Sequence, residues 1–111
     1  MKEIFSTKVF EDGFINEVHA STVLKTGENE FLCAFFGGTK EGKDDVKIWT
    51  SHFSDGKWSL PVIVAEGIDE PCWNPVLFRY DDKIMLFYKI GKPIPAWRTM
   101  LMESTDNGAT W

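Results

Sequence analysis

The stretch STDNGATW, from Ser104 to Trp111, decides the fold and also closes the chain. Serine, aspartate, asparagine and glycine are the residues of tight turns, because short polar side chains bond nearby backbone groups and glycine accepts a positive φ. The stretch follows a run of apolar residues and therefore indicates a turn that joins two strands. The second of these strands does not begin before Trp111, so we expect the chain to be the N-terminal fragment of a longer protein.

The composition is that of one globular domain or a piece of one. The chain has 111 residues, of which 43% are hydrophobic and 26% are charged, and its net charge is −5. An acidic chain without a basic patch argues against a nucleic-acid partner. No apolar run approaches the roughly 18 residues of a membrane span, and MKEIFSTKVFEDG lacks the apolar core of a signal peptide. We therefore expect no membrane partner and, by default, a cytoplasmic chain.

The chain has two cysteines, Cys33 and Cys72, and neither belongs to a motif with metal-ligand spacing. Cys33 lies in the apolar run EFLCAFF, where a free cysteine packs as a small hydrophobic residue. Two isolated cysteines do not make a disulfide framework. We expect reduced thiols, no metal site and no cofactor.

Short β-branched and aromatic runs alternate with turn residues at intervals of about eight to twelve positions, which predicts an all-β fold. The first four expected strands span residues 19–25, 30–37, 45–52 and 57–64. A second set follows at a constant offset of 53 residues, as between Val23 and Val76, Ile48 and Leu101, Ser51 and Ser104, and Trp58 and Trp111. The sequence therefore contains one structural unit and most of a second.

A repeat of about 50 residues with four antiparallel strands is typical of a β-propeller blade. Residues 19–71 would form the first blade and residues 72–111 the second, truncated at its turn, after a lead-in of residues 1–18 with a possible ring-closing strand in EIFSTKVF. A ring needs about four to eight blades, so the remaining blades would be missing from this chain. We expect the fragment alone to be inactive and poorly soluble, because open blades expose strand edges. A β-sandwich of about seven strands is the alternative.

The closing stretch carries the complete Asp-box pattern, and the residues that define it are Ser104, Asp106, Gly108, Thr110 and Trp111. A worn copy, Ser51 through FSDGKW to Trp58, occupies the first unit. Together with HASTVL, FFGGTKEG, IWTS, PCWNPVLF and LFYKIG, the pattern resembles the sialidase superfamily of BNR-repeat propellers, in its BNR_2 branch, over about residues 17–111. The resemblance implies that Asp106 stabilises the turn and is not a catalytic carboxylate.

Alternate loops of an up-and-down sheet lie at opposite ends of the sheet. One end should therefore collect the approach to His19, residues 39–45, the approach to Cys72 and residues 92–98. His19 opens an innermost strand at this end, and the offset of 53 makes it equivalent to Cys72. We interpret His19 either as a catalytic or ligand-binding group or as a packed histidine.

Two further catalytic candidates follow the glycine-rich loop FGGTKEGKDD. The resemblance puts the acid catalyst of the superfamily at about the position of Asp44 and Asp45. Adjacent carboxylates raise the pKa of one of them, which eases protonation near neutrality. Glu41 is a weaker candidate from the same loop, and a solvated surface pair is the alternative for the two aspartates.

Four residues are expected to bind substrate: Trp73, Asn74, Trp97 and Arg98. The tryptophan rings would stack on a sugar, the asparagine would bond its hydroxyls, and the arginine would bind a carboxylate. Packing between blades is the alternative for the tryptophans. An ion pair with Asp45 is the alternative for Arg98.

The resemblance implies a carbohydrate ligand and favours an exo-acting glycoside hydrolase on acidic glycans, in which an aspartate protonates the leaving oxygen. The tyrosine nucleophile of sialidases would then lie beyond Trp111. HAST, from His19, stands where ordinary sialidases carry an Arg-Ile-Pro-type motif, and this difference leaves two alternatives. One is a polysaccharide lyase on rhamnose–glucuronate linkages, with His19 and Arg98 in its site. The other is a propeller that binds glycans without catalysis.

Overall fold

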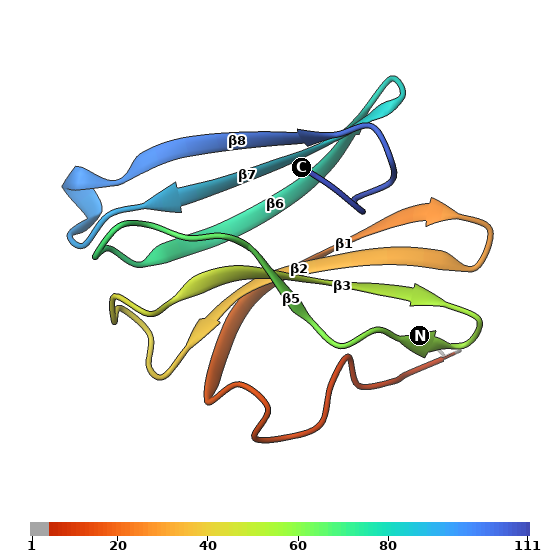
Figure 1. Cartoon of the computed structure of the whole chain (residues 1–111), viewed down its shortest axis with the longest axis horizontal. Coiled ribbons are helices and arrows are strands. Elements are labelled where there is room, and N and C mark those ends of the chain that lie inside the picture. Colours follow the sequence, from red (N-terminus) through yellow and green to blue (C-terminus); the bar gives the residue numbers. More distant parts are fainter. Residues whose placement is uncertain (1–4) are drawn as a thin grey trace.

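The computed structural model describes residues 5–111, which form two antiparallel sheets and no α-helix (Figure 1). The first sheet contains β1 (Glu17–Gly27), β2 (Glu30–Gly38), β3 (Lys47–Ser54), β4 (Lys57–Trp58) and β5 (Val62–Ala65). The second sheet contains β6 (Cys72–Tyr80), β7 (Lys83–Ile90) and β8 (Arg98–Ser104), and a 3-10 turn, η1 (Ile94–Ala96), precedes β8. The predicted all-β fold is confirmed.

Each sheet follows the order of the sequence. The first sheet runs β1-β2-β3-β4 with β5 also on β3, and the second runs β6-β7-β8. A sandwich of the immunoglobulin type would need Greek-key crossovers, and the described residues form none. The single strand expected at 57–64 is wrong, because the chain there forms β4 and β5, both paired with β3. Pro61 lies between them and has no N–H to give to the ladder.

The first strand of each sheet, β1 and β6 respectively, carries the same β-bulge. The bulge lies between His19 and Thr22 in β1 and between Trp73 and Val76 in β6. The residue after His19, Ala20, has φ 56°, and the residue after Trp73, Asn74, has φ 43°. These are left-handed conformations, which mark the same irregular point in both strands.

The bulges show that His19 corresponds to Trp73 and not, as the offset of 53 predicted, to Cys72. His19 pairs with Phe36, and Trp73 pairs with Lys89, so the offset is 54 residues in the first strands and 53 in the next pair. The loop before β8 is then shorter than the loop before β3. The offset of β8 from β3 is consequently 51, since Phe36 pairs with Ile48 and Lys89 with Thr99. A constant offset was therefore wrong for the first and third strands.

The two sheets meet through opposite faces. The first sheet buries Leu32, Ala34 and Phe36 in the shared core, and the second sheet buries Ile84 and Leu86 there. At the offset of 53 between β2 and β7, Leu32 corresponds to Met85, which points away from the shared core. Successive units therefore stack head to tail, as in a repeat array, and not as the two equivalent faces of a symmetric sandwich.

The outward face of the second sheet remains apolar and exposed. Val76, Phe78 and Leu101 are exposed there by 53%, 55% and 47%. Val76 pairs with Phe87 of the neighbouring strand, and Phe87 pairs with Leu101 of the next. Val76, Phe87 and Leu101 therefore form one row across the sheet. The equivalent row of the first sheet is the one that the second sheet covers.

The lead-in packs on the outward face of the first sheet. Val9, Phe10 and Ile15 contact the cluster that contains Cys33 and Phe35. The run EIFSTKVF was expected to hold a possible ring-closing strand; its first two residues lie outside the described residues, and residues 5–10 form no strand here. Whether this run pairs with a further repeat stays a prediction.

The STDNGATW turn is closed by its own side chains. The Ser104 hydroxyl donates to Asp106 Oδ1 at 2.7 Å and accepts from the Gly108 N–H at 2.8 Å. The Thr110 N–H and hydroxyl donate to the two oxygens of Asp106 at 2.9 and 2.5 Å. These bonds, with that of the Thr110 hydroxyl first, lower the pKa of Asp106 to about 2. Both oxygens of the carboxylate are therefore engaged within the turn.

The same turn packs on the first sheet. Gly108 has φ +88°, and a Cβ atom there would lie 2.8 Å from the Leu32 side chain, so only glycine fits. Trp111 packs against the core between the sheets. The degenerate copy of this pattern in the first sheet, between Ser51 and Trp58, forms a two-residue turn instead. Its turn residues, Asp55 and Gly56, both have positive φ.

Replacing a buried leucine tests the shared core. Leu86 has no exposed surface, so Leu86→Ala should lower the free energy of unfolding by about 2–5 kcal/mol. Leu60 is 72% exposed, so the matched Leu60→Ala should change it by less than about 0.5 kcal/mol. Urea denaturation followed by circular dichroism measures both. Equal effects of the two variants would contradict the packing described above.

Asp106→Asn tests the closing turn through its pH dependence. The pKa of Asp106 in the folded chain is about 2, below its ordinary 3.8, so the ionised carboxylate stabilises the folded chain above about pH 4. This stabilisation should disappear as the pH falls from about 4 to about 2. Thermal unfolding between pH 2 and pH 6 should show a smaller acid loss of Tm in Asp106→Asn than in the unchanged chain.

A matched control is Asp12→Asn, which removes an exposed carboxylate that pairs with Lys8 in the lead-in. It should leave the acid loss of Tm unchanged. An Asp106→Asn chain that loses as much Tm between pH 4 and pH 2 as the unchanged chain would show that the turn does not depend on this carboxylate.

Candidate functional site

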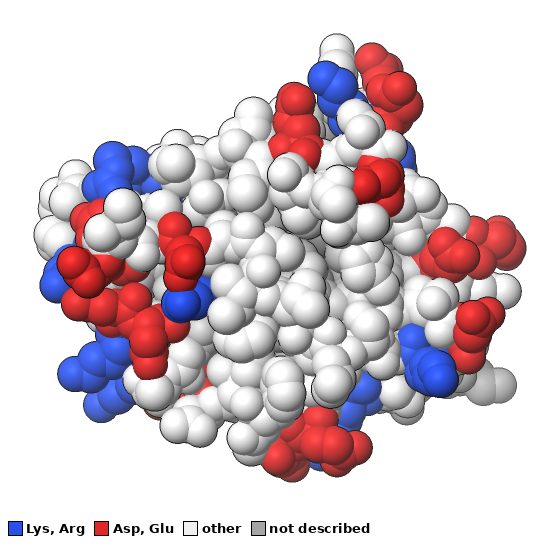
Figure 2. Space-filling view, viewed as in Figure 1, with Lys and Arg blue, Asp and Glu red and all other residues white. Residues whose placement is uncertain are grey.

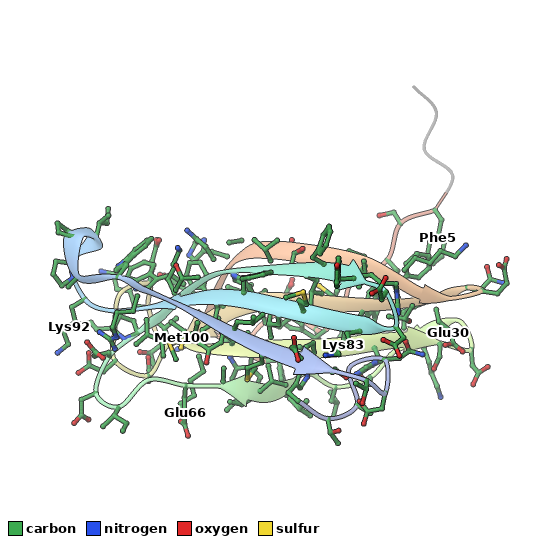
Figure 3. All side chains as sticks on the ribbon, turned by 90° about the horizontal axis from the view of Figure 1, so that it is seen from above. Phe5, Glu30, Glu66, Lys83, Lys92 and Met100 are labelled. Atoms are coloured by element: carbon green, nitrogen blue, oxygen red, sulfur yellow. The ribbon has the colours of Figure 1, made fainter. Side chains whose placement is uncertain are left out.

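Two loops and the starts of β1 and β6 meet at one end of the molecule, which we call the loop end. Residues 39–46 join β2 to β3, and residues 91–97 join β7 to β8; both lie at the left of Figure 1, beside the starts of β1 and β6. Lys92 marks this end in Figure 3, and Glu30 and Lys83 lie toward the opposite end. The loop end is where the sequence predicted the site.

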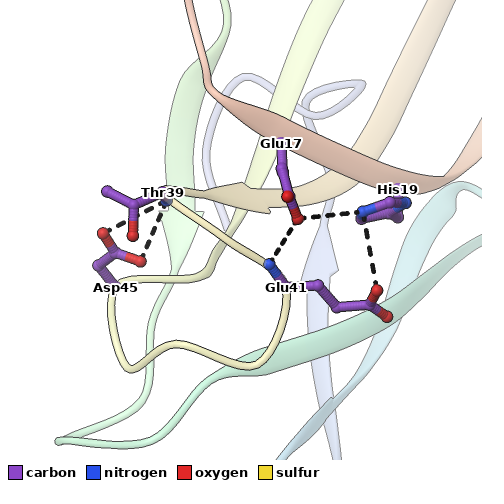
Figure 4. Close-up of polar contacts among 5 residues, drawn as sticks. All are labelled: Glu17, His19, Thr39, Glu41 and Asp45. Carbon is purple, nitrogen blue, oxygen red and sulfur yellow. Dashed lines mark hydrogen bonds and ion pairs between the residues drawn. The ribbon is translucent and has the colours of Figure 1, made fainter.

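His19 lies between two carboxylates at the loop end (Figure 4). Its Nε2 atom is 3.7 Å from Glu17 Oε2 and 3.8 Å from Glu41 Oε2. Its ring packs on the buried ring of Phe36, with centroids 5.5 Å apart. The side chain of His19 is 45% exposed, so a ligand can reach it. An exposed imidazole beside two carboxylates suits either proton transfer or hydrogen bonding to a ligand.

Glu17 connects β1 to the loop of residues 39–46. Its Oε2 atom accepts a hydrogen bond from the Glu41 N–H at 2.8 Å. This bond is the main cause that lowers the pKa of Glu17. Glu17 was not predicted from the sequence, although it lies two residues before His19, and residues two apart along a strand point to the same face.

The two aspartates expected to act as acid catalysts are engaged in the loop. Both oxygens of Asp45 accept from the Thr39 N–H, at 3.2 and 3.3 Å, which closes the loop on itself. Asp44 pairs with Lys92 at 3.3 Å and so connects the two loops. Asp44, Asp45 and Lys92 line one hollow between these loops with Gly42. His19 does not line this hollow.

The two tryptophans expected to bind substrate stack on one another. The rings of Trp73 and Trp97 have centroids 4.8 Å apart at an angle of 28°. The Trp73 Nε1–H donates to the Gly91 carbonyl at 2.7 Å. Trp73 also packs on Phe36, with centroids 5.7 Å apart. His19 and Trp73 therefore share the ring of Phe36 as their support, and Trp97 reaches it only through Trp73.

The remaining two substrate-binding candidates differ in what surrounds them. Arg98 bonds Glu70 through both of its terminal nitrogens, at 2.7 and 3.5 Å, and not Asp45. This bond lowers the pKa of Glu70 and raises that of Arg98. Asn74 lies exposed at the bulge of β6. Glu70 is a second residue that the sequence analysis missed, because its partner lies 28 positions along the chain.

The described residues contain no group of three or more histidine, cysteine or acidic side chains that could hold a metal ion. They also contain no helix long and apolar enough to cross a membrane. Cys33 and Cys72 are free and buried, and burial raises the pKa of each thiol to about 11. Neither thiol is therefore set up as a nucleophile.

Residues 29–111 match the BNR repeat-like domain family, BNR_2. The chain belongs to this family. The match covers most of the chain and confirms the resemblance to BNR-repeat proteins drawn from the Asp-box pattern. It relates the chain to the sialidase superfamily or an allied carbohydrate-active family. No curated protein and no solved structure matches the chain.

Removing the Glu17 carboxylate should loosen residues 39–46 of this BNR repeat-like domain. Glu17→Ala deletes the acceptor of the Glu41 N–H, so the amide hydrogen exchange of Glu41 should become about tenfold faster. Glu103→Ala is the matched control, because Glu103 pairs with Lys83 toward the opposite end. Exchange at Glu41 that is the same in all three proteins would show that Glu17 does not hold the loop.

Proposed function

We propose that this BNR repeat-like chain is part of a β-propeller that processes glycans, and that a sugar binds at its loop end. The head-to-tail stacking of the two sheets supports the propeller, because each further unit can cover the apolar face that the previous unit exposes. Family membership supports the carbohydrate ligand. The inner strands of such rings begin near the central axis, where ligands of ringed folds bind.

The observation that carries the proposal is that His19 and Trp73 both pack on Phe36, and that Trp97 stacks on Trp73. Aromatic rings stack on the apolar faces of sugars, and imidazole and carboxylate groups bond their hydroxyls. Trp73 and Trp97 are half-buried and His19 is exposed, so the loop end presents both kinds of group to solvent. The first and second repeats each supply part of it.

The proposed reaction is hydrolysis of a glycosidic bond with proton transfer by a group at the loop end. Among the three catalytic candidates, the geometry favours His19, because Asp45 is engaged with the Thr39 N–H and Asp44 with Lys92. The described tyrosines do not suit the sialidase nucleophile: Tyr88 is buried, and Tyr80 ends β6 away from the loop end. We therefore place the nucleophile in another part of the protein.

A lyase acting on rhamnose–glucuronate linkages is the second candidate. It would use His19 to move a proton and Arg98 to neutralise the uronate. The bonds from Arg98 to Glu70 make this arginine less available, so the hydrolase remains the first candidate. A propeller that binds a glycan without transforming it is the third.

His19→Ala and His52→Ala test the proposal as a matched pair, since the chain has two histidines and His52 lies in β3 away from the loop end. In a protein that carries this chain, a panel of 4-nitrophenyl glycosides reports hydrolysis, and ultraviolet absorbance of an unsaturated uronate reports lyase activity. His19→Ala should lower turnover by about 10²- to 10⁴-fold, and His52→Ala should leave it unchanged.

Three results would change the proposal. Formation of an unsaturated uronate would replace the hydrolase by the lyase. Sugar binding without turnover would leave a binding propeller. An equal loss of activity in both histidine variants would remove His19 from the site.

A further inference from the structure

The charged groups against His19 are acidic. Glu17 and Glu41 approach its ring to within 3.8 Å, and neither forms an ion pair with a lysine or arginine among the described residues. The side chains of Glu17 and Glu41 are 41% and 52% exposed, so a ligand that reaches His19 from solvent can also reach both carboxylates. A ligand at this position therefore meets two carboxylates beside one imidazole ring.

Two cations of the loop end are paired with other carboxylates, and a third, Lys40, adds less than the Glu41 N–H to the lowering of the pKa of Glu17. Arg98 bonds Glu70, and Lys92 pairs with Asp44. The other arginine, Arg79, donates to Asn107 in the closing turn, away from the loop end. Lys40 and Lys43 are exposed in the loop of residues 39–46. Figure 2 shows charges of both signs intermingled at the loop end, without a basic patch on the face in view.

A sugar carboxylate is held best by a free arginine, which can form two parallel hydrogen bonds to it. The described residues provide no arginine that is free for this purpose, since both are bonded to other side chains. A neutral sugar needs no cation. Its hydroxyls donate to carboxylate oxygens, and its apolar face stacks on an indole ring.

We propose that the sugar unit bound beside His19 is neutral, with hydroxyls that donate to Glu17 and Glu41 and an apolar face against the Trp73 and Trp97 pair. This inference rests on the proposed function and narrows its substrate class. It replaces the acidic glycan expected from the resemblance with a ligand that the local charges favour. Acidic units of the same glycan would bind elsewhere on the protein.

Pairs of glycosides, of which only one member carries a carboxylate, test the inference. The probes are methyl glucoside with methyl glucuronide, methyl galactoside with methyl galacturonide, and lactose with 3′-sialyllactose, titrated by tryptophan fluorescence in a protein that carries this chain. The neutral member of at least one pair should bind about tenfold more tightly at low salt. The difference should shrink at high salt, because salt screens the repulsion between exposed carboxylates.

Glu41→Gln removes one of the two carboxylate charges beside His19. It keeps the backbone N–H of residue 41, which donates a hydrogen bond to Glu17. This variant should narrow the difference between neutral and acidic probes by about threefold or more. Glu103→Gln, the same change of charge away from the loop end, should leave the difference as it was.

The outcomes separate this inference from the proposed function. Tighter binding of the acidic member in every pair would overturn the inference and leave a glycan-binding site. A preference that Glu41→Gln and Glu103→Gln change equally would also overturn it, because the preference would then reflect net charge. Binding of none of the six probes would overturn the proposed function itself.

Discussion

The ring of Phe36 joins the core of the molecule to its candidate site. It is 2% exposed, belongs to the core between the sheets, and contacts both His19 of β1 and Trp73 of β6. These two strands belong to different sheets, so the position of one site residue relative to the other depends on how the sheets pack. A change that loosened the core would therefore also separate His19 from the tryptophan pair.

The packing of the sheets also explains why one face of the chain is apolar and open. In a head-to-tail stack, each unit covers its predecessor and exposes the equivalent surface to its successor. The row of Val76, Phe87 and Leu101, in which Val76 and Leu101 are exposed, is the counterpart of a row that the first sheet packs against the second. The closing turn contributes to the same stacking, because Gly108 approaches Leu32 of the preceding unit more closely than any larger residue could.

Much of the fold follows from local patterns that the sequence displays directly, such as apolar alternation, turn residues and the Asp-box stretch. The site is harder to predict, because it depends on backbone irregularities. Ala20 and Asn74 both have a left-handed conformation, which asparagine often adopts and alanine seldom does. The stretch HAST therefore gave no sign of the bulge that aligns His19 with Trp73. The bonds of Glu17 and Glu70 join distant parts of the chain and have no local signature.

The most direct test of this account is to map a bound sugar on the indole N–H signals of the tryptophans by nuclear magnetic resonance. The account predicts that a neutral glycoside shifts the signals of Trp73 and Trp97 and leaves those of Trp58 and Trp111 in place, since the first two lie at the loop end. Shifts confined to Trp58 or Trp111, or no shift of any indole signal at saturating sugar, would contradict a sugar site at the loop end.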